Sequence, residues 1–267
     1  MDEIRKIQLL ELDMLKEFDK ICNQLELRYY ALGGTLLGAV RHGGFIPWDD
    51  DIDIGMPRND YEIFIQRASQ LLPTNMVIKP NKLNLNIMQI VNTNTRVKLG
   101  KEEMGVFIDI FPLDGYPSSK FLSLYQSKKV IFYRMLCKMA IIDSLVERDR
   151  GFLENAITTI TKKFHLNKAL NSDKLVKKIH NIIKKYDFET SLKVGNVLGR
   201  YRSREIVEKM TFGEGTTIKF EDIEIRVPSG YAAYLKAIYG DDYMELPPTE
   251  QRVAHQYEII SLGDNHE

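Results

Sequence analysis

Two aspartates separated by one residue, Asp51 and Asp53, are the side chains of this sequence most clearly suited to binding a metal ion. Successive side chains of a β-strand point to opposite faces, so a strand over Asp51–Met56 would place both carboxylates on one side, about 6.6–7 Å apart. Two carboxylates on one edge suit a hard divalent cation such as Mg²⁺, which takes oxygen ligands and usually keeps substrate phosphates as the remaining ones. The spacing therefore predicts a metal site.

A glycine pair precedes these acids by about eighteen residues. Gly33 and Gly34 allow a tight backbone turn after a strand expected over Leu27–Leu32. The N–H groups that open the next helix, expected from Thr35 to His42, form a natural phosphate site, because the helix dipole favours an anion there. A phosphate binder close to a metal binder indicates phosphoryl transfer from a nucleotide-like donor.

The polymerase-β-like nucleotidyltransferase superfamily has an active-site signature that this region resembles: a hydrophobic residue, G-G-T, a spacer and D-I-D-I. The LicD family is resembled more closely, over G-G-T-L-L-G-A-V-R-H-G-G-F-I-P-W-D-D-D-I-D-I-G-M-P-R. That family transfers phosphocholine from CDP-choline to sugars of teichoic acid or lipopolysaccharide. Two more segments are similar to it, Gly105–Gly115 and Pro228–Pro248, the second followed by Arg252 and His255. Little of the signature is found over 118–210.

By this resemblance, Asp51, Asp53 and Asp109 form the metal-binding and catalytic set, and two Mg²⁺ ions are expected. Asp109 lies in the apolar segment V-F-I-D-I-F, where a charge is costly unless a cation or a hydrogen-bond donor satisfies it. Surface acids without a role are the alternative for all three. Roles for Asp49 and Asp50 stay open.

An EF-hand calcium loop is another interpretation of the acidic run. Counting from Asp49, the sixth position should be glycine and is Ile54, and the twelfth should be glutamate and is Asp60. The pattern therefore excludes an EF-hand.

Donor binding is expected to involve residues on both sides of the acids. Arg41 and His42 can face the donor phosphates, or they can decorate a helix C-terminus for dipole reasons. Trp48 offers an aromatic face to a quaternary ammonium group such as choline, or it packs against the metal-binding strand. Arg252 and His255 can reach the same cleft, the latter as a phosphate contact or as an acid and base. The candidate substrate-binding residues are Gly33, Gly34, Thr35, Arg41, His42, Trp48, Arg252 and His255.

The elements that must position these groups follow from hydrophobic periodicity. Residues 3–26 predict an amphipathic helix, Asn59 can cap a helix that ends at Leu72, and Ser229 can cap one that ends at Ile238. Further strands are expected near 76–79, 86–91, 106–111 and 223–227, and further helices near 119–147, 151–164 and 172–187.

The predicted fold class is α/β (α+β), a nucleotidyltransferase-like mixed sheet with flanking helices and a mainly helical insertion. We expect a catalytic core over 1–117 and the helical insertion over 118–210. A C-terminal strand–helix segment over 211–267 would then complete the catalytic cleft.

Composition narrows the partners and the location. The 37 basic and 37 acidic residues balance, which argues against nucleic acid as a partner. The two cysteines, Cys22 and Cys137, lie in apolar helical stretches, so we expect reduced thiols and a cytoplasmic protein. The start M-D-E-I-R-K lacks a signal-peptide core. The helix over 119–147 mixes basic and apolar residues and can either touch the inner face of a membrane, near a lipid-linked acceptor, or pack in the core.

The resemblance implies Mg²⁺-dependent transfer of phosphocholine from CDP-choline to a sugar hydroxyl of a glycan precursor, with release of CMP. A nucleotidyltransferase that moves a nucleoside monophosphate to a small acceptor is an alternative. A D-x-D glycosyltransferase is another, although about fifty mostly helical residues before the motif leave little room for its nucleotide-binding region. A non-catalytic binding protein would have no use for three such carboxylates.

Overall fold

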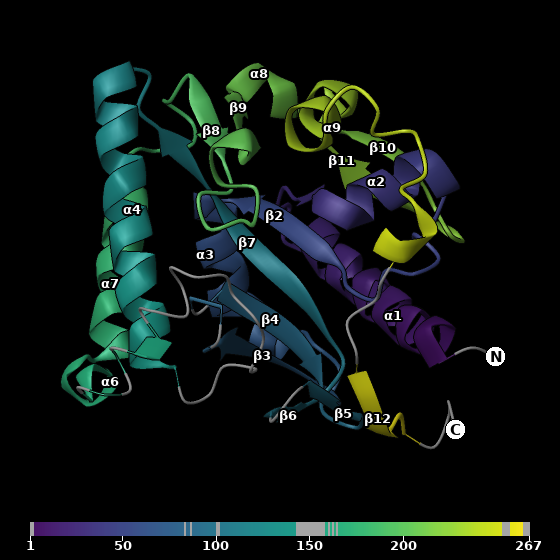
Figure 1. Ribbon diagram of the computed structural model, residues 1–267. Coiled ribbons are helices and arrows are strands. Elements are labelled where there is room, and N and C mark those ends of the chain that lie inside the picture. Colours follow the sequence, from purple (N-terminus) through teal and green to yellow (C-terminus); the bar gives the residue numbers. More distant parts are fainter. Residues whose placement is uncertain are drawn as a thin grey trace.

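A mixed β-sheet crosses the centre of the molecule, with helices packed around it (Figure 1). The computed structural model describes residues 3–82, 84, 85, 87–99, 102–142, 158, 159, 161, 163, 165–252 and 257–263. Strand β2 runs parallel to β7, whereas the other paired strands of this sheet are antiparallel. The predicted fold class is therefore confirmed. The strand order is β1 (Tyr30–Ala31), β2 (Asp53–Pro57), β7 (Phe107–Tyr116), β4 (Ile87–Asn92) and β3 (Met76–Asn81).

Helix α1 (Glu3–Gln24) forms where the sequence predicts it, because its apolar residues recur every three or four positions and share one face. That face is buried in the core. The ring of Phe18 lies 5.0 Å, centroid to centroid, from the rings of both Tyr29 and Phe64. Since Phe64 belongs to α3 (Arg58–Arg67), this aromatic cluster joins α1 to the helix that follows β2.

Several elements begin at residues other than the predicted ones. β2 begins at Asp53 rather than Asp51, and β1 pairs over two residues instead of the predicted Leu27–Leu32. Helix α2 (Gly33–His42) begins at the glycine pair itself rather than at Thr35. The strands start late because pairing depends on where the neighbouring strand lies. Local hydrophobic periodicity carries no information about that position.

The two predicted caps are wrong. Asn59 lies inside α3, since this helix already begins at Arg58 after Pro57. Ser229 accepts a hydrogen bond from the Gly215 N–H through its Oγ, and Gly230 takes the N-cap position of α9 (Tyr231–Tyr239). Both polar side chains lie close to a helix start, but the local backbone path places another residue at the cap.

β7 is longer than the 106–111 strand expected, because a second partner extends it. Its last three residues pair with β8 (Lys193–Gly195), and β8 pairs in turn with β9 (Ile206–Glu208). A buried ion pair stabilises this end of β7, with the Arg58 guanidinium donating to both carboxylate oxygens of Asp114 at 2.8 and 2.5 Å. The segment after α4 therefore returns to the central sheet.

The remaining elements surround this sheet. Helices α4 and α7 stand side by side along one edge, and a hairpin of β10 and β11 lies beside α2 and α9 (Figure 1). The 151–164 helix expected from the sequence lies mostly outside the described residues. The helices are η1 (Ala68–Gln70), α4 (Lys120–Ala140), α6 (Leu166–Ala169), α7 (Ser172–Ile183), η2 (Arg202–Glu205), α8 (Lys209–Phe212) and η3 (Thr249–Gln251). The strands are β5 (Arg96–Leu99), β6 (Glu102–Met104), β10 (Thr216–Phe220), β11 (Ile223–Val227) and β12 (Tyr257–Ser261), and β12 pairs with β5. Within the described part of the chain, no helix is both long and apolar enough to cross a membrane.

Candidate active site

Three polar side chains form a row across the centre of the sheet. Asp53 of β2 is the direct partner of Asp109 of β7, and Gln89 of β4 is the partner of Asp109 on the other side. Adjacent strands lie about 4.8 Å apart, so the two carboxylates are close neighbours on one face. The buried Gln89 donates a 2.7 Å hydrogen bond from Nε2 to Oδ1 of Asp109. The sequence analysis missed Gln89, although a glutamine inside the apolar run I-M-Q-I-V is a signal that could have found it.

Asp51 enters this site from a loop rather than from the strand. The ladder between β2 and β7 extends only one residue upstream of Asp53, through a 2.9 Å hydrogen bond from the Asp109 N–H to the Ile52 carbonyl. The pair fixed by sheet register is therefore Asp53 with Asp109, and β2 begins two residues later than the strand expected over Asp51–Met56. The reason is that β1, which would support a longer β2, pairs with it over only two residues.

The glycine pair lies directly against the acids. A Cβ on Gly33 would stand 2.9 Å from Oδ2 of Asp53, and a Cβ on Gly34 would overlap Oδ2 of Asp49. Gly33 also has a φ of 49°, a conformation that glycine adopts without strain. Thr35 joins the same point, because its Oγ1 accepts a 2.8 Å hydrogen bond from the Asp53 N–H. Only glycine allows the start of α2 to approach the carboxylates this closely.

The N-terminus of α2 is suited to an anion. Among the described residues, no side chain caps this helix, whose N-cap is Leu32. The first N–H groups of a helix have no partner inside it, and they carry the positive end of its dipole. A phosphate placed there would lie beside the Asp53 and Asp49 carboxylates, and a cation would offset the repulsion between these anions.

Burial and the neighbouring acids raise the pKa of the Asp53 carboxyl. Burial, and then the charges of Asp51, Asp109 and Asp49, raise the pKa of the Asp53 carboxyl well above its usual range. A bound cation would offset the repulsion between a buried carboxylate and the acids beside it.

Helix α1 contributes two polar residues that the sequence analysis missed. Gln8 donates from Nε2 to the carbonyls of Asp49, at 2.8 Å, and Ile46, at 3.2 Å, and so holds the acidic loop. Glu11, one turn later, is buried, and its Oε2 has no hydrogen-bond partner among the described residues. Burial and the nearby charges of the acidic loop, that of Asp51 first, raise the pKa of Glu11. Polar residues inside the apolar stripe of a predicted helix are the signal that could have found both.

The donor set fits a cation that arrives with its substrate. In the described part of the chain, no three His, Cys, Asp or Glu side chains form a complete metal-binding group. Mg²⁺ is commonly held by one or two carboxylates, with water and substrate phosphates as the other ligands. The register pair Asp53 and Asp109, the unpartnered Glu11 oxygen and the glycine cradle match that incomplete kind of site.

A second group of predicted residues meets beside the acidic loop. The Arg252 guanidinium lies over the Trp48 ring at 5.1 Å, and the His42 ring contacts the same indole edge to face at 6.2 Å. Arg41 donates through Nη1 to the carbonyls of Tyr243 and Glu245 at 3.1 and 3.0 Å. The C-terminal segment therefore returns to α2 and to Trp48. His255 lies outside the described residues.

Charge and burial act together on this second group. Burial lowers the pKa of Arg41, and the neighbouring Arg252 lowers it further, whereas Tyr239 and Asp49 raise it. Burial and Arg41 lower the pKa of His42. Two arginines thus lie near each other, and Arg41 already donates to two backbone carbonyls.

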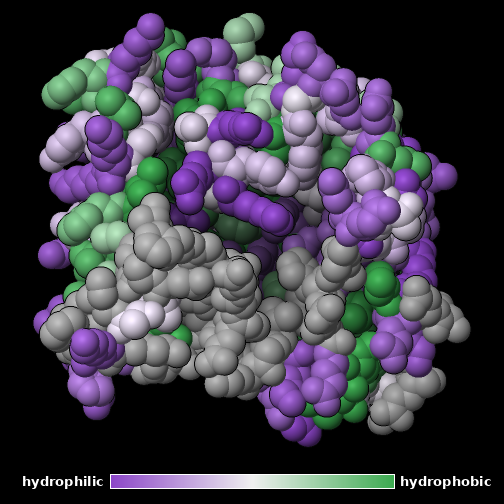
Figure 2. Space-filling view, in the orientation of Figure 1, coloured by the Kyte–Doolittle hydropathy of each residue, from purple (hydrophilic) through white to green (hydrophobic). Residues whose placement is uncertain are grey.

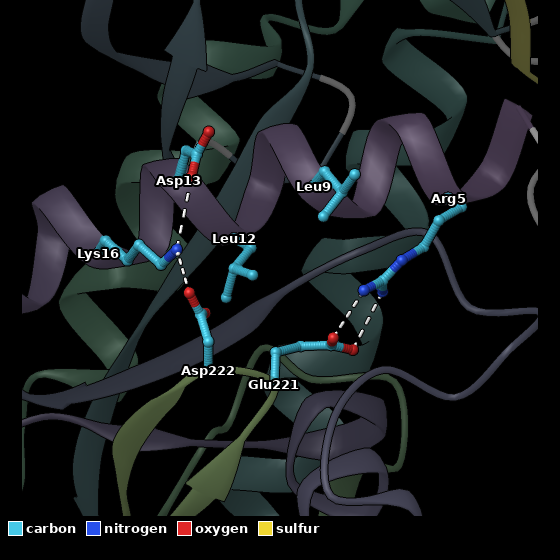
Figure 3. Close-up of a pocket in the computed structure, with 7 residues that line it drawn as sticks. All are labelled: Arg5, Leu9, Leu12, Asp13, Lys16, Glu221 and Asp222. Carbon is cyan, nitrogen blue, oxygen red and sulfur yellow. Dashed lines mark hydrogen bonds and ion pairs between the residues drawn. The ribbon is translucent and has the colours of Figure 1, made fainter. Parts of the chain in front are cut away.

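A groove of about 340 Å³ elsewhere on the molecule does not include these groups. It lies between α1 and the turn of the β10–β11 hairpin (Figure 3). Its charged side chains pair with one another, Arg5 with Glu221 at 2.6 Å and Lys16 with Asp222 at 2.9 Å. These two ion pairs therefore hold the hairpin against α1, and the charges are already neutralised within the groove.

The chain is similar in sequence to known proteins. The family described as LicD/FKTN/FKRP, nucleotidyltransferase domain, matches residues 26–138, which include the glycine pair and all three predicted acids. The lipopolysaccharide cholinephosphotransferase LicD of Haemophilus influenzae is 30% identical over 262 residues, which cover 94% of this chain and 95% of the relative. The ribitol 5-phosphate transferase FKRP of Mus musculus is 56% identical over 34 residues, 13% of this chain and 7% of that protein. An uncharacterized protein of Rickettsia typhi is 40% identical over 70 residues, 26% of this chain and 23% of that protein.

Proposed function

Because the chain belongs to the LicD family, we propose that it transfers phosphocholine from CDP-choline to a sugar hydroxyl of a cell-surface glycan precursor. The observation that carries this proposal is the similarity, along nearly the whole chain, to a lipopolysaccharide cholinephosphotransferase. The acceptor would be a precursor of lipopolysaccharide or of teichoic acid, and CMP would be released.

The proposed reaction is a displacement at the phosphorus of phosphocholine. The acceptor oxygen forms a bond to this phosphorus, the bond to the CMP oxygen breaks, and its electron pair leaves with CMP. The proton of the acceptor hydroxyl passes to a carboxylate, for which Asp109 is our candidate because Gln89 fixes its orientation. Such a reaction depends mainly on positioning and on neutralising charge.

The donor diphosphate would lie at the N-terminus of α2, where Gly33 and Gly34 leave room for it. Asp51, Asp53 and Asp109 would hold Mg²⁺, which we expect as two ions. When bound, Mg²⁺ supplies positive charge to the phosphoryl oxygens. Trp48 already carries a guanidinium on one face, and a quaternary ammonium is attracted to an aromatic face in the same way. The side chain of Trp48 is therefore our candidate choline contact.

Product analysis tests this proposal directly. Purified protein would be incubated with CDP-choline and lipoteichoic acid or deacylated lipopolysaccharide, with either Mg²⁺ or EDTA, and the nucleotide products separated by chromatography. We expect CMP and a phosphocholine-bearing acceptor with Mg²⁺, and neither with EDTA. Free phosphocholine with a nucleotidylated acceptor would instead show nucleotidyl transfer and overturn the proposal.

Donor binding gives a second measurement that does not need the right acceptor. Isothermal titration should show CDP-choline binding more tightly with Mg²⁺ than with EDTA, since the metal is proposed to arrive with the diphosphate. UDP-glucose is the matched probe for the glycosyltransferase alternative. Tighter binding of UDP-glucose than of CDP-choline would favour that alternative.

A further inference from the structure

Helix α4 exposes large apolar side chains on one face. Phe121 is 76% exposed and Tyr125 is 58% exposed, and Leu124, Ile131 and Phe132 are also exposed. Residues three or four positions apart share a helix face, so these side chains form one stripe along α4. Exposed aromatic and aliphatic residues that gather in this way usually mark an interaction surface.

The opposite face of α4 is fully used by the protein. Val130 and Cys137 are buried, and Arg134 donates a 2.8 Å hydrogen bond to the Leu198 carbonyl. The Tyr116 hydroxyl contacts Ser127 Oγ at 2.5 Å and joins α4 to the end of β7. The helix is therefore fixed with the apolar stripe outward, rather than loosely placed.

Basic residues accompany the stripe. Helix α4 contains five Lys or Arg residues and no Asp or Glu, although the whole chain has a net charge of zero. Lys120 and Lys128 are exposed, and the Lys129 ammonium lies 5.6 Å from the centre of the Tyr125 ring. Green and purple side chains alternate along the left side of Figure 2, where α4 lies.

The neighbouring helix α7 adds charge of the same sign. Lys174, Lys177 and Lys178 are exposed on it, and Asp173 is the one acid among its residues. Together the two helices give one edge of a neutral protein a positive surface, so its binding partner should be negative.

We propose that the exposed face of α4, formed by Phe121, Leu124, Tyr125, Lys128, Ile131 and Phe132, docks on an anionic membrane surface. An amphipathic helix of this kind lies in the plane of the interface, with its apolar side chains below the headgroups and its lysines beside the lipid phosphates. A nucleic acid or anionic glycan would use the lysines but gains nothing from exposed phenylalanine and leucine. The lipid surface accounts for both kinds of residue.

Vesicle flotation with the full chain tests this inference, and it needs no catalysis, so its failure is separate from that of the proposed function. We expect the protein to float with vesicles of phosphatidylcholine and phosphatidylglycerol, but not with phosphatidylcholine alone. Added salt should weaken the binding, because it screens the lysines. The double variant Phe121→Ser/Leu124→Ser should lose binding by at least about tenfold, the size expected when two apolar anchors leave an interface.

A matched control uses exposed apolar residues outside this face. Leu192 and Met210 are 70% and 83% exposed, so Leu192→Ser/Met210→Ser removes comparable surface elsewhere and should bind vesicles as the parent does. Circular dichroism checks that both variants are folded. Equal binding by the two double variants, or equal binding to neutral and anionic vesicles, would overturn the inference. So would a parent dimer in light scattering that becomes monomeric in Phe121→Ser/Leu124→Ser, since the face would then join two copies of the chain.

Discussion

Two neighbouring strands fix the position of the Asp109 carboxylate: β2 places Asp53 beside it and β4 supplies the hydrogen bond from Gln89. Asp53 is positioned by α2 instead. Its backbone N–H donates a hydrogen bond to Thr35, and its side chain lies against Gly33. At the scale of single residues, the two acids thus face different partners. In the proposed function Asp53 would face the donor, whereas Asp109 lies toward the middle of the sheet.

Replacing Asp109 with Asn should separate these roles. The Asn carbonyl can still accept the hydrogen bond from Gln89, so the geometry remains and only the charge is lost. We expect the single-turnover rate to fall by about 10²-fold or more, while CDP-choline affinity stays within about tenfold. Asp222→Asn is the control, because it makes the same chemical change at an exposed ion pair outside the site. A collapse of affinity with a normal rate at saturation would make Asp109 a donor ligand instead.

Glu205 provides a pH-dependent prediction at the same scale. Burial raises the pKa of this carboxyl from 4.5 to about 7. Below pH 4.5 the carboxyl is protonated in both the folded and the unfolded protein. Between pH 4.5 and about pH 7 it loses its proton only in the unfolded protein, so folding becomes less favourable as pH rises. Glu205→Gln should remove a penalty of up to about 3 kcal/mol at pH 8 while still accepting the hydrogen bond from the Tyr201 N–H.

Urea unfolding of the parent and of Glu205→Gln at pH 5 and pH 8 measures this effect. The stability of the variant relative to the parent should rise between the two pH values. Parallel pH profiles would show that Glu205 is ionised in the folded protein over the whole range.

At the scale of elements, the start of α2 and the acidic loop are positioned against each other. Gly34→Ala should keep the fold, because the added methyl meets only the mobile end of a side chain, the Asp49 carboxylate. The displaced carboxylate and the blocked backbone should weaken CDP-choline binding by at least about tenfold in isothermal titration. Gly43→Ala is the contrast, since its methyl meets nothing within 4 Å while the φ of 68° is strained. That variant should lose stability but retain affinity, and equal affinity in both variants would give the glycine pair a packing role only.

The hairpin of β10 and β11 contacts the segment between α2 and the acidic run. Glu221 accepts hydrogen bonds from Arg5 of α1 at 2.6 and 3.0 Å (Figure 3). It also accepts one from the Phe45 N–H at 3.2 Å, so one carboxylate joins three segments. The hydrogen bond from Arg5 lowers the pKa of Glu221. The stabilisation is therefore present above the pKa of the unfolded state, near 4.5, and is lost as pH falls below it.

Glu221→Gln should lower the free energy of unfolding at pH 7 by less than about 1 kcal/mol, because solvent screens a partly exposed pair. A double-mutant cycle with Arg5→Gln isolates the pair, and its coupling should shrink at pH 4. Coupling that does not change with pH would mean that the contact works through shape rather than charge.

At the scale of the whole molecule, β7 belongs to two parts of the sheet at once. Its first half pairs with β2 and β4, and its end pairs with β8, beyond helices α4 and α7. Because one strand is shared, we expect the core and the segment after residue 118 to unfold together.

Labelling of the two thiols can measure whether the core and the segment after residue 118 unfold together. Cys22 lies in α1 and Cys137 in α4, and both are buried. Burial raises the pKa of Cys137 to about 11 and that of Cys22 further, so native labelling should be slow. In increasing urea, labelling followed by mass spectrometry should modify both thiols together, with fully unfolded protein as the fast-labelling control. Earlier labelling of Cys137 would show that the helical part opens on its own.

The candidate site residues and the family can be named from the amino-acid sequence alone. The glycine pair, the acidic run and Trp48 lie within 26 residues, and Asp109 lies in its own apolar strand, so local patterns were sufficient to find them. The amphipathic face of α1 and the mixed α/β class also follow from short-range periodicity, which survives folding because each element buries its own apolar face.

How these residues meet depends on the packing of segments that are far apart in the chain. Strand register places Asp109 directly beside Asp53 and brings Gln89 to the same row. Packing of α1 brings Glu11 beneath the acidic loop, and the returning C-terminal segment places Arg252 on Trp48, more than two hundred residues away in the chain. Such contacts depend on long-range pairing and on which faces remain uncovered, and no local spacing of residues encodes either one.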